Sequence, residues 1–169
     1  MADRPCRGGR RRHAVKLSTK GRYAVTAMTD LAAHSKGEPV TLADIAERQE
    51  ISLSYLEQLF CKLRKGGLVK SVRGPGGGYR LSKSAAQTRV ADIIMAVDEP
   101  LKATGCNVGD EHGCHSKRGR CLTHDLWEEL SNHIYLFLHS VTLADVVERN
   151  VIGRAKERKV ASGDPSVAA

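Results

Sequence analysis

The chain has 169 residues, of which 41% are hydrophobic and 4% aromatic, and it carries a formal net charge of +8 at pH 7. This length suits one compact domain or a small domain with an oligomerisation arm. Its basic opening has no apolar core of a secretory signal, and no later apolar run approaches the roughly 18 residues of a membrane span. We therefore expect a cytoplasmic protein with no membrane partner.

The positive charge is unevenly distributed along the chain. Residues 1–15 carry a net charge of +4, residues 16–83 carry +6, and residues 84–169 carry −2. The basic half is expected to face a polyanion, for which double-stranded DNA is the natural candidate. Charge alone is equally compatible with a solvated basic surface.

Three helices are predicted in the first part of the chain. Residues 17–34 carry apolar side chains at helical spacing. A second helix opens at Thr41, whose hydroxyl can cap it while Asp44 faces the positive helix start. A third runs over 52–65, and the two glycines after it supply a left-handed stop. Its apolar stripe leaves other side chains to a partner: Ser54, Glu57, Gln58 and Cys61.

A hairpin follows in the segment LVKSVRGPGGGYRLS, where two short β-prone runs flank a glycine-rich, basic tip. Two short helices at a tight turn, followed by such a hairpin, predict a mainly α fold with a small β-hairpin wing, the winged helix-turn-helix. Its second helix enters the major groove and the wing reaches a neighbouring groove or the backbone. A purely structural hairpin is the alternative, but Arg73 and Arg80 around the glycines favour approach to phosphate.

Two further helical segments are predicted. Residues 88–97 form a short helix, and a second apolar stripe repeats mostly every four residues at Leu122, Leu126, Leu130, Ile134, Leu138 and Val141. This long dimerisation helix calls for a partner helix, in a homodimer that reads a palindromic site. Packing within one chain is the alternative. Residues 141–150 nearly repeat 40–49 because both helices use the same Thr and Asp start.

Cysteine and histidine gather between residues 106 and 124, which hold three of the five cysteines and three of the seven histidines. In a chain without an export signal, such clusters bind metal or catalyse more often than they form disulfides. Structural zinc sites pair their cysteines two to four residues apart in two knuckles, whereas only the last Cys–His pair here is tight. An iron–sulfur cluster is therefore favoured over zinc.

Two other functional classes lack support in the sequence. An enzyme would show a Ser, His and acid arrangement, a glycine-rich nucleotide loop or paired carboxylates, and none of these patterns accompanies the cysteines. A 2Fe-2S electron-transfer protein would not need a basic helix-turn-helix. We therefore expect a regulator and not an enzyme.

Several stretches together carry a family resemblance: LSTKGRYAVTAMTDLA, ISLSYLEQLF, LRKGGLVKSVRGPGGGYRLS, AVDEPLKATGC and CLTHDLWEEL. Over roughly residues 15–150 they resemble the IscR family of winged-helix regulators of iron–sulfur cluster assembly. The resemblance implies a homodimeric repressor and activator whose operator choice depends on a 2Fe-2S cluster supplied by the assembly machinery. The implied ligands are Cys106, Cys114, Cys121 and His124.

Alternatives within this interpretation are a nitric-oxide- or redox-sensing relative and a zinc-stabilised winged-helix regulator. His112 and His115 lie close enough in sequence to replace His124 as the fourth ligand. In the family, an acidic residue at the position of Glu57 keeps the cluster-free protein from one class of operator. The predicted DNA-binding residues are Lys20, Arg22, Ser52, Ser54, Tyr55, Glu57, Gln58, Arg73, Gly74, Gly76, Gly77, Gly78 and Arg80.

These predictions divide the chain into consecutive regions. In the resembled family the opening KLSTKGRY directly follows the initiator, so we expect either that translation of the native protein starts at Val15 or that residues 1–14 only add nonspecific DNA affinity. The predicted regions are a basic disordered extension (1–14), the DNA-binding domain (15–85), a connecting helix and linker (86–105), the cluster loop (106–124), the dimerisation helix region (122–150) and a disordered tail (151–169).

Overall fold

The computed structural model describes residues 18–99 and 121–152. The predicted N-terminal extension, Cys106, Cys114, the two alternative histidines and nearly all of the predicted tail lie outside these ranges. The elements in chain order are α1 (Thr19–His34), α2 (Leu42–Gln49), α3 (Leu53–Lys65), β1 (Val69–Val72), β2 (Gly78–Leu81), the 3-10 turn η1 (Ala85–Gln87), α4 (Val90–Ala96), α5 (His124–Ser140) and α6 (Leu143–Val147).

Local capping fixes where these helices begin and end. The Thr41 hydroxyl accepts a hydrogen bond from the Asp44 amide at 3.1 Å, and Thr142 forms a full capping box with Asp145 at the start of α6. The shared Thr and Asp start predicted for the two segments is confirmed. At the end of α3, Gly67 takes a φ of 73°, the left-handed conformation predicted for the stop.

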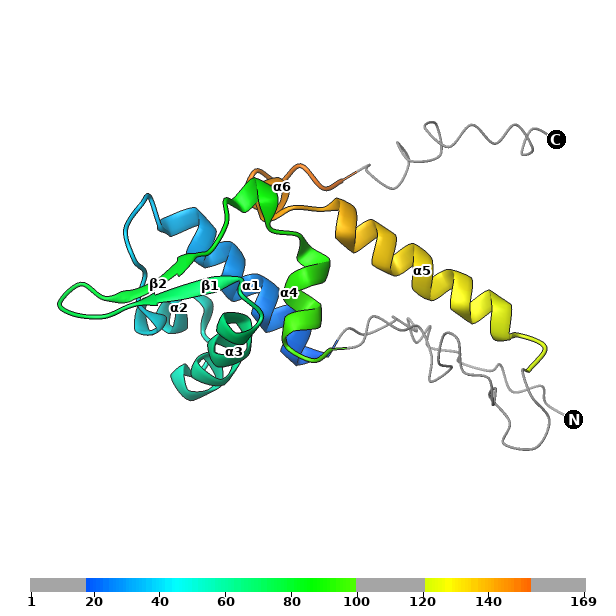
Figure 1. The fold of residues 1–169 in the computed structure, drawn as a ribbon, viewed down its shortest axis with the longest axis horizontal. Coiled ribbons are helices and arrows are strands. Elements are labelled where there is room, and N and C mark those ends of the chain that lie inside the picture. The colour runs from blue at the N-terminus through cyan, green and yellow to red at the C-terminus, as the bar shows by residue number, and fades with distance from the viewer. Residues whose placement is uncertain (1–17, 100–120, 153–169) are drawn as a thin grey trace, which may run out of the picture.

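The wing is a two-stranded antiparallel hairpin whose register pairs Val69 with Leu81 and Val72 with Gly78. It is attached to the helices through backbone pairing. Val40, just before α2, exchanges two hydrogen bonds with Tyr79 of β2, at 3.0 and 2.8 Å. Helices α1 to α3 and this hairpin confirm the predicted winged helix-turn-helix, drawn with the wing protruding in Figure 1.

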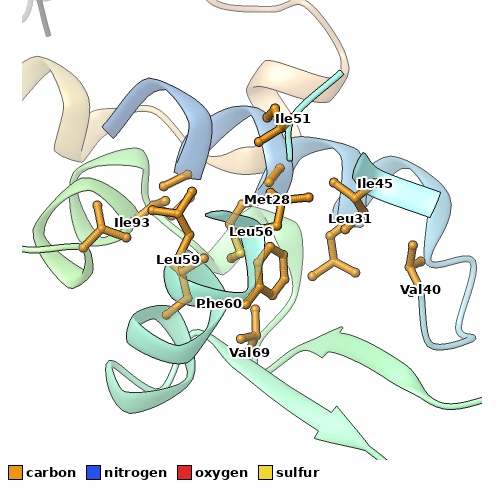
Figure 2. Packing of buried hydrophobic residues seen from close by; sticks show 14 of the residues in the cluster. Met28, Leu31, Val40, Ile45, Ile51, Leu56, Leu59, Phe60, Val69 and Ile93 are labelled. Carbon is orange, nitrogen blue, oxygen red and sulfur yellow. The ribbon is translucent and has the colours of Figure 1, made fainter. Parts of the chain in front are cut away.

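The main core lies between α1, α2, α3 and the base of the wing. Phe60 of α3 is fully buried, and its ring meets Tyr79 of β2 edge-on at a centroid distance of 4.9 Å. Figure 2 shows Phe60 surrounded by side chains from α1, α3 and β1. The labelled residues of this cluster are Met28, Leu31, Val40, Ile45, Ile51, Leu56, Leu59, Phe60, Val69 and Ile93. Burial of this apolar surface holds the back of α3 against the domain.

The C-terminal elements return to this domain and then leave it. Residues 88–90 pair with 141–143, because the Val90 amide donates to the Val141 carbonyl at 3.0 Å and the Leu143 amide donates to the Thr88 carbonyl at 2.9 Å. Leu143 of α6 is fully buried in the main core. Helix α5 extends away from the domain instead (Figure 1). No helix in the described ranges is long and apolar enough to span a membrane.

The apolar stripe predicted along α5 is graded rather than uniformly buried. Exposure is complete at Leu122, 61% at Leu126, intermediate at Leu130, and only 3% at Val141. The buried end packs on α4, where Val90, Ile94 and Val141 form a second small core. Intramolecular packing therefore accounts for the C-terminal half of the stripe and leaves the N-terminal half uncovered by described residues.

A charged network inside the domain connects α1 with α2. The Asp30 side chain is fully buried and accepts hydrogen bonds from the Arg48 guanidinium, the shortest at 2.6 Å, and from the Gln49 amide at 2.7 Å. Burial acts to raise the pKa of Asp30, but the hydrogen bonds from Arg48 and Gln49 and the Arg48 charge outweigh it, so the pKa lies below its usual value. Asp30 therefore stays ionised at neutral pH.

We expect Asp30→Asn to lower the free energy of unfolding by about 2 kcal/mol at pH 7, because Arg48 loses its charged partner. In the wild type this contribution is present above the unfolded-state pKa, near 4, and is lost as pH falls through the lower folded-state pKa. Urea denaturation between pH 3 and pH 7 measures both effects. The matched control is Glu47→Gln, which removes an exposed carboxylate from α2. Equal losses in the two variants would contradict the assignment.

Candidate functional site

Helix α3 presents a polar face to solvent because its apolar side chains point into the core. Leu56, Leu59, Phe60 and Leu63 are buried, whereas Ser54, Glu57 and Gln58 are exposed. A helix that is held from behind and polar in front can enter a major groove and offer hydrogen-bonding groups to base edges. These three side chains occupy the position predicted for them from the stripe.

The first turn of α3 holds two predicted residues in different environments. Ser52 is exposed, and its hydroxyl makes no capping bond to the helix, so the hydroxyl is available to a ligand. Tyr55 is half-buried, and its ring lies edge-on to Tyr23 of α1 at 6.0 Å. Its aromatic body thus packs the domain. Leu53 in the same turn is 43% exposed and was not among the predicted residues. It is an apolar residue off the buried stripe, and an apolar side chain is the type that contacts a thymine methyl.

The glycines of the wing tip are required for different structural reasons. Gly74 and Gly76 have φ angles of 106° and 72°, which L side chains rarely adopt. A Cβ on Gly77 would lie 2.6 Å from the Val72 carbonyl oxygen, and one on Gly78 would lie 2.4 Å from that of Val40. Gly77 is therefore required by the wing's own backbone, and Gly78 by the backbone of Val40 that pairs with the wing. Contact of any of the four with DNA stays a prediction.

The predicted cationic contacts are also unequal. Arg22 of α1 and Arg73 of the wing tip are exposed, whereas Arg80 lies 3.4 Å from the Glu38 carboxylate. Lys20 is close to Lys62 of α3, and the interaction between the two side-chain amines lowers the pKa of Lys20. Lys62 was not predicted as a site residue. It forms an ion pair with Asp98 at 2.7 Å, which raises the pKa of Lys62.

Two of the four predicted cluster ligands fall in the described ranges, at the start of α5. Cys121 is half-buried and His124 is buried, and the His124 amide donates to the Cys121 carbonyl at 3.0 Å, so one turn carries both. The Cys121 sulfur lies 3.6 Å from the Thr123 hydroxyl oxygen, which accepts a hydrogen bond from the Trp127 indole at 3.2 Å. Glu128 Oε2 lies 3.4 Å from His124 Nε2. Thiol and imidazole are ligand types that iron–sulfur clusters use.

The described ranges, 18–99 and 121–152, contain no group of three or more Cys, His, Asp or Glu side chains placed to hold a metal ion. Cys106 and Cys114 lie outside these ranges. Cys61, which was not predicted as a ligand, is half-buried on α3.

The sequence profile of the Rrf2 family, described as iron-dependent transcriptional regulators, matches residues 17–149. The chain belongs to the Rrf2 family. The HTH-type transcriptional regulator IscR of Vibrio atlanticus (strain LGP32) is 55% identical over 147 residues, which cover 86% of this chain and 82% of the relative. The chain is thus an IscR-type Rrf2 regulator, and the expectation that it is not an enzyme is confirmed by these relatives.

Two solved Rrf2-type structures share the fold. T. potens IscR matches with a TM-score of 0.64 and 41% identity, covering 80% of this chain and 88% of its own. CymR, the global cysteine regulator of B. subtilis, matches with a TM-score of 0.65 and 34% identity, covering 79% of this chain and 97% of its own. The winged-helix fold of this chain is therefore shared with solved transcriptional regulators.

Attachment of the wing generates a prediction at Gly78. In Gly78→Ala the new Cβ would meet the Val40 carbonyl at 2.4 Å, and relief requires breaking the two Val40–Tyr79 hydrogen bonds. We expect a loss of about 2 kcal/mol in unfolding free energy from this overpacking. Gly76→Ala should cost only about 1 kcal/mol, the cost of a left-handed φ. Urea denaturation compares them, and hydrogen exchange at the Tyr79 amide should increase in Gly78→Ala alone.

Proposed function

We propose that this protein is a cluster-sensing transcription factor of the cytoplasm. As a homodimer it binds double-stranded operator DNA of iron–sulfur cluster assembly genes, represses or activates them, and selects operators according to whether it holds a 2Fe-2S cluster. The observation that carries the proposal is the exposed polar face of α3 beside an exposed, cationic wing tip, in a chain whose 55%-identical relative is named IscR. The cluster assembly machinery is the proposed donor of the cluster.

The DNA contacts follow from the geometry of α3 and the wing. Ser54 and Gln58 can donate or accept hydrogen bonds at base edges, and Arg73 at the tip can enter a neighbouring groove. Lys20 and Arg22 near the start of α1 are assigned to phosphates, which position the protein without reading sequence. The mixed roles predict that base-contacting substitutions change specificity and phosphate-contacting ones change overall affinity.

Glu57 is the residue through which this surface would discriminate between operators. Its carboxylate is exposed on the same face as Ser54 and Gln58. In a groove, a carboxylate is repelled by phosphates and loses hydration, and this cost is offset only where it accepts a hydrogen bond such as that from cytosine N4. We propose that a shift of α3 between the cluster-bound and cluster-free states decides whether Glu57 meets repulsion or such a donor.

The cluster is assigned to Cys106, Cys114, Cys121 and His124. Cys121 and His124 support this assignment, because one turn at the start of α5 brings them together. When bound, the cluster supplies a redox-active centre, and this centre is lost when the cell's supply of clusters falls. An imidazole binds metal only after it has lost its proton, so a site with one histidine responds to pH. Because the bound imidazole is neutral, such a site also holds its cluster less tightly than four anionic thiolates would.

The homodimer is assigned to the uncovered part of α5. Leu122, just before this helix, is fully exposed and Leu126 within it is 61% exposed, whereas the opposite end of the helix packs on α4. Large apolar side chains exposed in a row mark association surfaces. Two copies would also place two α3 helices to read two half-sites of a palindrome.

The central prediction is that anaerobically purified protein carries about two irons and two sulfides per chain. Replacing Cys106, Cys114 or Cys121 by Ala should remove the iron and the red-brown absorbance, whereas Cys61→Ser on α3 should keep both. Metal analysis and absorption spectra measure this, and a colourless, zinc-containing protein would refute the cluster assignment. Binding of cluster-loaded and cluster-free protein to duplexes selected from a random library, at one salt concentration, then tests cluster-dependent selection.

A second prediction concerns the dimer. Leu126→Glu should raise the dimer dissociation constant at least tenfold, because burial of one leucine contributes about 1.5–3 kcal/mol and a buried carboxylate opposes association. Asn132→Asp adds the same charge at an exposed polar position of α5 and should change little. Sedimentation equilibrium measures the constant, and circular dichroism checks that α5 stays helical. Unchanged association of Leu126→Glu would assign the dimer to another surface.

A further inference from the structure

Two adjacent carboxylates at the end of α4 contact the DNA-binding elements, although neither was assigned a role. Asp98 pairs with Lys62 of α3 through Oδ2 at 2.7 Å. Glu99 accepts hydrogen bonds from both the amide and the hydroxyl of Ser18, the N-cap of α1, the amide bond being 2.9 Å long. One dipeptide thus touches the predicted recognition helix and the start of the helix that carries Lys20 and Arg22.

The backbone at this dipeptide is fixed by a Schellman motif. The Asp98 amide donates to the Met95 carbonyl at 3.0 Å and the Glu99 amide to the Ile94 carbonyl at 3.3 Å. Asp98 holds the left-handed position of the motif, with a φ of 54°, where glycine or asparagine is usual. A glycine would suit this backbone better, so the aspartate is explained by its side chain and not by its conformation.

The approach of the neighbouring helices directs both side chains. A Cβ on Gly66, at the end of α3, would lie 2.9 Å from Ala96 Cβ, so the ends of α3 and α4 pack almost in contact. A Cβ on Gly21 would lie 3.5 Å from Glu99 Cγ, so the stem of Glu99 runs along the first turn of α1. The carboxylates therefore extend toward α3 and α1 from a rigid corner.

The ion pair does little for fold stability. The Lys62 and Asp98 side chains are 39% and 75% exposed, and exposed pairs of this kind contribute little to stability. What the pair does fix is position, because Lys62 lies one helical turn after Gln58 on α3. A carboxylate at the N-terminus of α1 similarly fixes that helix start, where the helix dipole favours negative charge.

We propose that Asp98 and Glu99 form an acidic clasp that positions α1 and α3 for operator recognition and transmits the state of the adjacent cluster-binding segment to them. Transmission rests on the proposed function, since Cys106 follows Glu99 by seven residues in the chain. Any change in where the chain leaves α4 acts first on these two carboxylates. Asp98 and Glu99 are thus positioning residues that act through Lys62 and Ser18.

The test uses Asp98→Asn and Glu99→Gln in the full-length protein, with Asp92→Asn as the control. Asp92 is exposed near the start of the same helix, so its substitution makes the same charge change away from the clasp. The probes are a duplex selected by the wild type from a random library and a scrambled duplex. Each clasp variant should lose about tenfold in the ratio of selected to scrambled affinity, the size of one good base contact.

Electrostatics alone predicts a different result. Removing a negative charge near DNA strengthens binding to both duplexes alike and leaves the ratio unchanged, as expected for Asp92→Asn. An unchanged ratio in the clasp variants would therefore overturn the proposal. If Asp98 acts through Lys62, Asp98→Asn should add no further loss in a Lys62→Gln background. Additive losses would overturn that link.

Two further measurements separate this inference from the proposed function. Hydrogen exchange at the first-turn amides of α1 should accelerate in cluster-free Glu99→Ala, and unchanged exchange would overturn the clasp even if no duplex is selected.

In protein that holds its cluster, the variants should keep their iron content but lose at least half of any cluster-dependent difference in affinity. Loss of iron from Asp98→Asn would make the dipeptide part of cluster binding and refute its role as a transmitter. If the wild-type protein held no cluster, or selected no duplex from the random library, that result would refute the proposed function alone.

Discussion

The arrangement of the DNA-binding helices depends on a buried carboxylate. Asp30 is 3% exposed, and an ionised group in that position must be paired and hydrogen-bonded. Its partners, Arg48 and Gln49, are consecutive residues at the end of α2. Apolar contacts such as those of Ile45 are non-directional, whereas the guanidinium meets the carboxylate at defined angles. Because α3 starts only four residues after Gln49, this pairing limits how the recognition helix can be directed.

The sequence predicted those features whose cause is local. Capping by Thr41 acts over three residues, and the left-handed Gly67 acts within one turn, so both could be read from the chain. The exposed face of α3 followed in the same way from the spacing of its buried leucines. The Asp30–Arg48 pair spans 18 residues and the Lys62–Asp98 pair spans 36. Nothing in the sequence distinguishes these carboxylates from solvated ones, because their partners are set by packing.

Residues with two physical roles limited prediction of the site. Tyr55 has an apolar ring and a polar tip, and the sequence could not show that its ring packs on Tyr23. Glycines at the wing tip fit both close approach to phosphate and close approach to the chain's own backbone. The structure shows the second reason at Gly77 and Gly78. Similarly, the leucine stripe of α5 packs on α4 at one end and is exposed at the other, where we propose the dimer contact, and both demands have the same periodicity.

Chain connectivity relates the two halves of the proposed mechanism. Glu99, the last described residue before residue 100, accepts a hydrogen bond from the N-cap of α1, and Cys121 begins the turn that leads into α5. The proposed ligands lie on both sides of this junction, with Cys106 and Cys114 in the connecting segment and Cys121 and His124 on the α5 side. A cluster bound by all four ligands would connect the clasp to α5, the helix assigned to the dimer. The connection would run along the chain to Cys106 and Cys114 and then through the cluster to Cys121 and His124. Loss of the cluster would remove that link while leaving Asp30, the core and the wing attachment intact, so the change would reach DNA as a repositioning of folded elements and not as unfolding.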